Sequence, residues 1–343
     1  MSQEPSHHRP KTIADVARAA GVSPMTVSKV LRGTGRISEE TRARVRRLAD
    51  EMGYVPNSLA GALSSQTSRL VGVLIPSVSD QVYAEVLSGI NAVLNPRGLT
   101  GLIGETFFDP STEERLIRTM LSMQPAGLII SGGINRTAAA LRLLRQGGPR
   151  SVQIWDGDRP DLDATVGLSH VAVGQLAAQT FLSVGLRDCC YVGAELARDL
   201  CAAQRCEGFL STLRQAGAAA RSITADDLPR NAEGGRILTE RLLGQGPLPA
   251  AIHYLNDAMA TGGLRALLAA GIAVPDAVSV IGFNGTSLRH AIRTRLTTIE
   301  VPLAEVGRRA AEAVIRQDHP AEPVRVELVG LHLNPGTTVR GLA

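Results

Sequence analysis

The chain has 343 residues, of which 44% are hydrophobic and 20% charged, which is typical of a soluble globular protein with two or three folding units. Its net charge of +4 is carried by residues 1–68, which hold ten Lys and Arg against six Asp and Glu, while the remainder holds 26 of each. A basic terminal segment on a neutral body indicates a polyanionic partner for that segment alone. The polar opening and the lack of any run of about 18 apolar residues exclude a signal peptide or membrane span, so we expect a cytoplasmic protein.

The usual sequence patterns of enzymes and metal sites are missing. The sequence contains no P-loop, HExxH or GxSxG, and its seven His are scattered. Its four cysteines follow no zinc or redox spacing, and we expect buried, reduced thiols at Cys189, Cys190, Cys201 and Cys206. The sequence therefore predicts no catalysis, no metal and no cofactor.

Residues 12–33 predict a helix-turn-helix. Thr12 is a suitable N-cap for a first helix, Gly21 permits a left-handed turn, and Ser23 followed by Pro24 favours the start of a second helix. The second helix would bury its valines and expose the side chains that could enter a major groove: Pro24, Met25, Thr26, Ser28 and Lys29. Residues 37–53, with Ser38 as N-cap, predict a third helix.

From residue 69 onward, short β-branched runs alternate with amphipathic helical stretches. Strands are expected at 70–75, 99–104, 127–131 and 151–154, then again at 190–193, 250–254 and 278–283. Ser111 and Glu114 suggest a capping box at the start of one intervening helix. Two such series predict two Rossmann-like lobes with parallel sheets, and a ligand cleft at the carboxyl ends of the strands.

The N-terminal segment resembles the lactose-repressor (LacI/GalR) family. The similarity is carried by GVSPMTVSKVLRG and RISEETRARVRRLADEMGYVPN within residues 12–57, and by the following NSLAGAL. The body is similar to the gluconate-utilisation branch, in VQIWDGDRPDLDATVG, VIGFNG, RLTTIEVP and LHLNPG. The resemblance implies an all-α helix-turn-helix headpiece (1–54), a hinge helix and linker (55–68), and an α/β periplasmic-binding-protein-like body (69–343). Lobe 1 of that body would comprise about 69–169 and 300–327, and lobe 2 about 170–299 and 328–343.

The resemblance also implies double-stranded operator DNA as the partner of a homodimer. Pro24, Met25 and Lys29 stand where the family's recognition helix reads bases, and Thr12, Thr26 and Ser28 complete the expected contact surface. In the hinge, Asn57, Ala60 and Leu63 are expected at the DNA, with Leu63 wedged into the minor groove.

In the body, the resemblance implies a small-molecule effector site at Ser77, Tyr83, Asp156, Ser169, Arg205, Asn256 and Asn284. The Arg205 guanidinium would suit a carboxylate. Ser169-His170 replaces a common Asp-Asn, and Asn284 replaces Asp or His, so the cleft loses negative charge, which favours an anion. We expect a repressor induced by a sugar acid such as gluconate. The alternatives are a sugar-binding protein without a regulatory role, or a regulator that responds to a neutral sugar or a purine.

Overall fold

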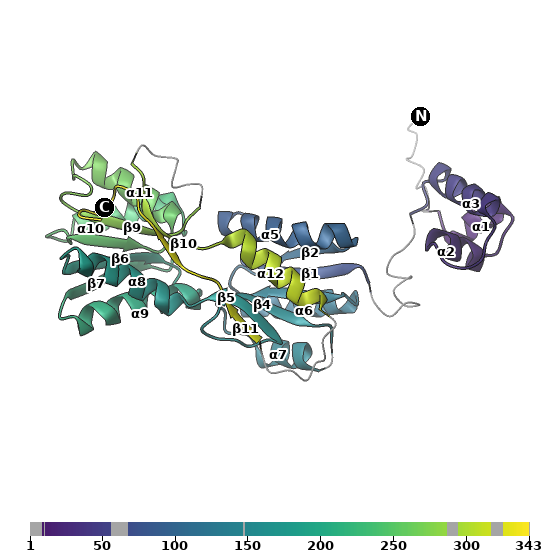
Figure 1. Cartoon of the computed structure of the whole chain (residues 1–343), viewed down its shortest axis with the longest axis horizontal. Helices are drawn as coiled ribbons and strands as arrows, with labels where there is room; N and C mark the ends of the chain where they lie inside the picture. Colours follow the sequence, from purple (N-terminus) through teal and green to yellow (C-terminus); the bar gives the residue numbers. More distant parts are fainter. Residues whose placement is uncertain are drawn as a thin grey trace, which may run out of the picture. The chain divides into compact units, whose positions relative to one another are not determined.

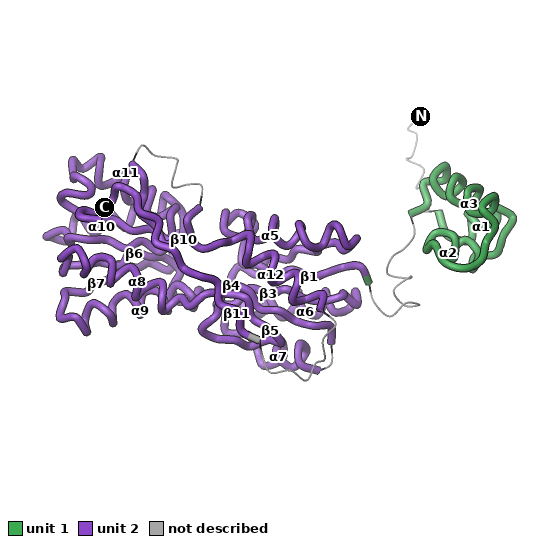
Figure 2. The backbone as a smooth tube through the Cα atoms, viewed as in Figure 1, with its two compact units in different colours: residues 1–68 green, residues 69–343 purple. Residues whose placement is uncertain are grey.

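The computed structural model describes residues 9, 11–55, 68–146, 148–286, 294–316 and 325–342. The chain forms two compact units, residues 1–68 and 69–343 (Figure 2). The hinge positions Asn57, Ala60 and Leu63 lie outside the described residues, so their roles stay predictions. Among the residues that are described, no helix is both long and apolar enough to cross a membrane.

The first unit is a three-helix headpiece comprising α1 (Ile13–Ala20), α2 (Pro24–Leu31) and α3 (Glu39–Glu51). The predicted N-caps are confirmed: Thr12 caps α1, Ser23 caps α2 and Ser38 caps α3. Gly21 ends α1 with a φ of 64°, the left-handed conformation expected for the turn. A small core holds the helices together, formed by Val16, Ala17, Ala20, Val27, Val30, Val45 and Ala49.

Lobe 1 of the second unit is built on a six-stranded parallel sheet with the order β11-β5-β4-β3-β1-β2 (Figure 1). Its strands are β1 (Leu70–Ile75), β2 (Thr100–Glu105), β3 (Gly127–Ser131), β4 (Ser151–Asp156), β5 (Ala164–Leu168) and β11 (Arg325–Leu328). Its helices are α5 (Gln81–Leu94), η1 (Asn95–Arg97), α6 (Pro110–Ser122), α7 (Ala138–Arg145) and α12 (Leu303–Ile315).

Lobe 2 repeats this arrangement with the strand order β12-β10-β9-β8-β6-β7, in which only β12 is antiparallel to its neighbour. Its strands are β6 (Asp188–Ala194), β7 (Ala219–Ala225), β8 (Ala251–Tyr254), β9 (Ser279–Asn284), β10 (Thr297–Glu300) and β12 (His332–Asn334). Its helices are α8 (His170–Ser183), α9 (Leu200–Gln215), α10 (Ala232–Leu243) and α11 (Asp257–Ala269). The predicted fold, a helical headpiece with two parallel-sheet lobes, is confirmed.

One predicted helix start was wrong. Ser111 does not cap α6, because the chain turns into the helix two residues earlier and Pro110 occupies the first turn. Asp109 is the N-cap, and its Oδ1 accepts hydrogen bonds from the Thr112 amide at 2.6 Å and the Ser111 hydroxyl at 2.6 Å.

Neighbouring helices in the body approach closely at glycines. A Cβ on Gly262 of α11 would collide with the carbonyl oxygen of Ala232 at the start of α10. A Cβ on Gly235 of α10 would likewise collide with the carbonyl oxygen of Met259 in α11. Gly89 and Gly307 allow the same close approach between α5 and α12. These glycines therefore allow the two helices of each pair to pack closely.

Candidate functional site

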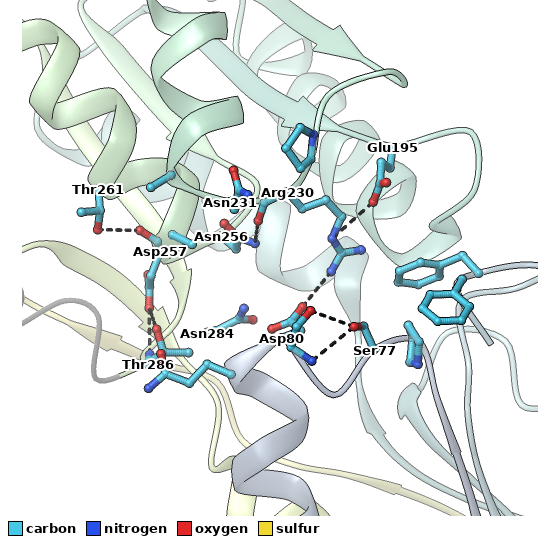
Figure 3. A pocket seen from close by; sticks show the side chains of 18 of the residues that line it. Ser77, Asp80, Glu195, Arg230, Asn231, Asn256, Asp257, Thr261, Asn284 and Thr286 are labelled. Carbon is cyan, nitrogen blue, oxygen red and sulfur yellow. Dashed lines mark hydrogen bonds and ion pairs between the residues drawn. The ribbon is translucent and has the colours of Figure 1, made fainter. Parts of the chain in front are cut away.

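A cavity of about 640 Å³ lies between the two lobes of the body, at the carboxyl edges of both sheets (Figure 3). In each sheet the strand order reverses at a central strand, β1 in lobe 1 and β6 in lobe 2, which leaves a crevice at the strand ends. The lining residues follow or end strands of both sheets: Ser77 after β1, Phe107 after β2, Glu195 after β6, Asn256 after β8 and Asn284 at the end of β9.

Three of the predicted effector residues, Ser77, Asn256 and Asn284, line this cavity. The Asn256 amide is engaged at both ends, since its Oδ1 caps α11 at the Met259 amide (2.8 Å) and its Nδ2 donates to the Arg230 carbonyl (3.0 Å). Asn284 is 6% exposed, and its Oδ1 has no hydrogen-bond partner among the described residues. Its φ of 108° is strained for a residue with a side chain, and such strain concentrates at binding sites. Asn284 therefore presents a buried acceptor without a protein partner at the wall of the cavity.

Tyr83 and Arg205 lie deeper, around a smaller space lined also by Trp155 and Phe283. Arg205 is 2% exposed and donates to His170 Nδ1 at 2.7 Å, with its guanidinium carbon 4.4 Å from the centre of the Phe283 ring. Burial, followed by the Arg205 charge, holds the pKa of His170 well below its usual range, so the ring is a neutral acceptor. The Arg205 guanidinium, which we expected to face a ligand carboxylate, therefore forms part of the floor of the cleft.

Asp156 and Ser169 line neither space, and the predicted ligand contact is replaced by a structural role for each. Asp156 Oδ1 accepts the amides of Asp158 (3.1 Å) and Arg159 (3.2 Å), which closes the turn after β4. Ser169 Oγ accepts the Ala172 amide at 3.0 Å and caps α8. Both side chains accept hydrogen bonds from backbone amides at the start of a turn or helix, because those amides have no backbone partner of their own.

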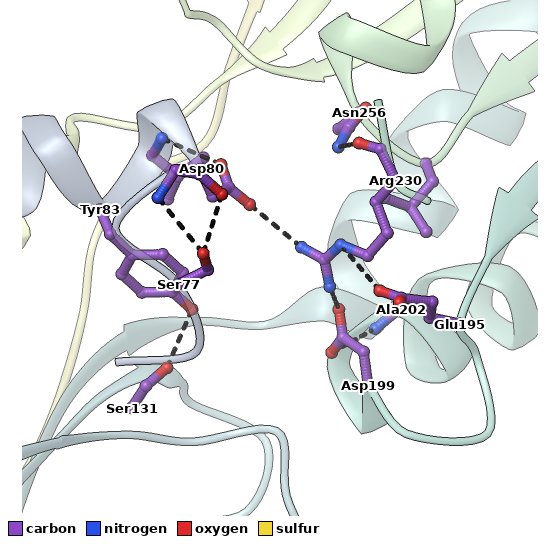
Figure 4. A network of polar contacts seen from close by, with 12 residues as sticks. Ser77, Asp80, Tyr83, Ser131, Glu195, Asp199, Ala202, Arg230 and Asn256 are labelled. Carbon is purple, nitrogen blue, oxygen red and sulfur yellow. Dashed lines mark hydrogen bonds and ion pairs between the residues drawn. The ribbon is translucent and has the colours of Figure 1, made fainter. Parts of the chain in front are cut away.

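The sequence analysis did not single out Arg230, which lies in the loop between β7 and α10 and lines the cavity (Figure 4). Its guanidinium pairs with Asp199, with Asp80 at 3.3 Å and with Glu195 at 4.0 Å. Burial alone would lower the pKa of Arg230, but these carboxylates outweigh it and raise the pKa. No local motif marks Arg230; the only sequence signal is its position directly before the N-cap Asn231.

Asp257, also missed, anchors the turn that carries Asn284. Its carboxylate is 1% exposed and accepts the Thr298 hydroxyl at 2.6 Å and the Thr286 amide at 2.8 Å. Burial raises its pKa to about 6. Asp257 therefore holds the backbone from Asn284 to Thr286 in place while its own carboxylate stays buried.

The headpiece exposes the predicted recognition surface on α2. Pro24 and Lys29 are exposed, as is Met25 with 63% of its surface accessible. Thr26 is half-buried, and its hydroxyl shares a 2.9 Å hydrogen bond with Ser23; Ser28 is also half-buried. Thr12 is exposed, but its hydroxyl donates to Asp15 at 2.7 Å within the capping box of α1.

The comparisons with known proteins agree with both units. Residues 12–57 match the model of bacterial regulatory proteins of the lacI family, and residues 178–339 match a periplasmic binding protein-like domain. The chain is 38% identical over 306 residues to the HTH-type transcriptional regulator GntR of Pseudomonas aeruginosa, a match that covers 89% of this chain and 88% of that protein.

Two solved structures share the architecture. A lacI-family transcriptional regulator from Silicibacter pomeroyi has a TM-score of 0.89 and 38% identity, covering 96% of this chain and 99% of the other. The lac repressor dimer bound to operator and the anti-inducer ONPF has a TM-score of 0.81 at 23% identity, covering 96% and 99%, and shows the likeness of fold. The chain belongs to the lacI family of bacterial regulatory proteins, and it is a ligand-responsive, DNA-binding transcriptional repressor rather than an enzyme.

Proposed function

We propose that this repressor is induced by a small sugar acid, such as gluconate, which binds in the cleft between the lobes and lowers the affinity of the dimer for its operator. The observation that carries the proposal is a cavity lined by polar side chains from both lobes, at which several helices begin. Its volume of about 640 Å³ lies within the range of about 300–1,000 Å³ that is usual for small-molecule sites.

The helix N-termini favour an anion. The N-caps Asp80 of α5, Asn231 of α10 and Asn256 of α11 all line the cavity, so three helices of 12 to 14 residues begin at it. The positive end of each helix dipole is therefore directed at the ligand. The buried Oδ1 of Asn284, which has no hydrogen-bond partner among the described residues, supplies an independent hydrogen-bond acceptor at the same cavity.

Arg198 is the cation we assign to the ligand carboxylate. It is exposed on the cavity wall, and among the described residues no carboxylate lies within ion-pair distance of it. Arg230 is already neutralised by carboxylates, and Arg205 is buried with its guanidinium against Phe283 and His170, so we assign the ligand carboxylate to neither. The sugar hydroxyls would be bonded by Ser77 and Asn284, which donate and accept hydrogen bonds as polyols require.

On the DNA side, we assign base contacts to Met25 and Lys29 of α2 and minor-groove insertion to the hinge Leu63. Two headpieces in a homodimer would read two half-sites of a near-palindromic operator, and such a regulator would act in the cytoplasm. Closure of the lobes on the ligand would shift the N-terminal lobes of the dimer and disfavour paired docking of the hinges.

Isothermal titration calorimetry tests the effector. D-gluconate and related aldonates should bind, whereas D-glucose, D-ribose and purines should not. Arg198→Gln should weaken D-gluconate binding by about tenfold or more, since charge-assisted hydrogen bonds are the strong ones. Arg214→Gln, an exposed arginine at the end of α9, is the matched control and should bind normally. Tight binding of a neutral sugar or purine without any aldonate binding would overturn the sugar-acid assignment.

A further inference from the structure

Arg230 of lobe 2 makes two contacts with lobe 1 across the cleft. Its Nη2 lies 3.3 Å from Asp80 Oδ2, and its guanidinium carbon lies 4.8 Å from the centre of the Phe108 ring. Among the ion pairs of the described residues, the Arg230–Asp80 pair is the one that joins the two lobes.

On lobe 2, the Arg230 side chain is held in position by residues that are themselves fixed by hydrogen bonds. Asp199, whose side chain is 3% exposed, pairs with Arg230 through one carboxylate oxygen while the other caps α9 at the Ala202 amide, 3.1 Å away. The Arg230 carbonyl accepts from Asn256, which caps α11. Arg230 therefore contacts the N-caps of two lobe 2 helices, α9 and α11, as well as lobe 1.

On lobe 1, the residues that Arg230 contacts are also held in place. Asp80 Oδ1 accepts the Val82 amide at 3.1 Å as the N-cap of α5, which leaves Oδ2 for Arg230. Phe108 is held in a left-handed conformation with a φ of 55°. With side-chain exposures of 15% for Arg230 and 26% for Asp80, the pair is better shielded than a surface ion pair.

We propose that Arg230 is an interlobe latch: together with Asp80 and Phe108 it stabilises the closed arrangement of the two lobes, and so raises effector affinity by preorganising the cleft. A ligand that binds only the closed arrangement loses affinity in proportion to the fraction of protein that is open. The part of this inference that concerns effector affinity rests on the proposed function, whereas the stabilising contact between the lobes does not.

Trp155 provides a readout that needs no ligand. It is the single tryptophan of the chain, it is 7% exposed, and its ring lies 6.3 Å from Tyr83 of lobe 1 and 6.1 Å from Phe283 of lobe 2. Opening of the cleft should therefore expose it to acrylamide, which quenches its fluorescence.

The test uses the full chain with Asp80→Asn, Arg230→Gln and the double variant. Asn is itself a good N-cap, so Asp80→Asn removes the charge and keeps the start of α5. The quenching constant should rise in both single variants, and the double variant should rise no further because the same contact is already lost. Arg221→Gln, which breaks the exposed Arg221–Asp188 pair of lobe 2, is the matched control and should quench like the wild type.

D-gluconate affinity is the second measurement, and it should fall about fivefold in Asp80→Asn. If Arg230→Gln fails to fold because Asp199 is left unpaired, Asp80→Asn and Arg230→Lys still decide the question. Unchanged quenching in Asp80→Asn would overturn the latch. Increased quenching without D-gluconate binding to any variant, the wild type included, would support the latch and contradict only the proposed effector.

Discussion

Asp257→Asn should remove a pH dependence of stability from the body. The folded protein holds the carboxyl pKa of Asp257 at about 6, against an ordinary 3.8, because the group is buried. The folded state therefore binds this proton more tightly than the unfolded state. Stability from this group is greatest below about pH 4 and is lost as the pH rises through 6.

The size of the effect follows from the shift. Each pKa unit corresponds to about 1.4 kcal/mol, so a shift from 3.8 to about 6 amounts to roughly 3 kcal/mol in total. About 1 kcal/mol of this is lost between pH 5 and pH 7. Because Asn carries no titratable proton, the stability of the wild type relative to the variant should fall by that amount over this interval.

The assay is urea unfolding followed by the fluorescence of Trp155, which lies in the body and so is insensitive to the headpiece. Measurements at several pH values between 5 and 7 give the free energy of unfolding of each protein. Asp188→Asn changes a carboxylate that is 46% exposed and serves as control; its curve should run parallel to that of the wild type. If the Asp257→Asn curve also runs parallel to the wild type, the argument from burial is wrong.

Three further predictions concern packing and DNA binding. Gly262→Ala should destabilise the body by about 2 kcal/mol or more, because the new Cβ would overlap the Ala232 carbonyl. Gly330→Ala places its Cβ in open space and should change stability by about 0.5 kcal/mol or less; urea unfolding measures both variants. Lys29→Ala should weaken operator binding and relax the preference for one base pair of the half-site, as measured by fluorescence anisotropy with the operator and its single-base variants, and an equal loss of affinity for every sequence would contradict a base contact. Leu63→Ala should weaken operator binding in the same assay while leaving the urea unfolding curve unchanged; equal losses of both would contradict a role confined to DNA.

Local signals in the sequence located the headpiece helices and seven strands of the body, but not β5, β7, β10, β11 and β12. Thr12, Ser23 and Ser38 were predicted as caps because each precedes a helical apolar pattern, and each caps its helix. The Ser111 prediction failed because Asp109 caps the Thr112 amide and so starts the helix two residues earlier, with Pro110 in the first turn. Such choices between adjacent caps depend on the backbone path, which the pattern of residues does not specify.

The cleft was less predictable because its charges come from separate segments. Arg230 matters through Asp80 and Asp199, 150 and 31 residues away in sequence, and neither contact leaves a motif. Arg205 was expected to face the ligand from the family resemblance and because a guanidinium suits a carboxylate, but the Phe283 ring and the His170 acceptor hold it in the floor. Strand ends located Ser77, Asn256 and Asn284 because parallel sheets bring them to one edge.

We expect a sugar acid in the cleft to control the affinity of the headpieces for DNA. The most direct measurement is fluorescence anisotropy of a labelled operator, selected from random duplexes, titrated with the full chain with and without saturating D-gluconate. We predict that D-gluconate weakens operator binding by about 5-fold to 150-fold and that D-glucose has no effect. Operator affinity that stays unchanged while calorimetry records D-gluconate bound to the same protein would contradict the claim.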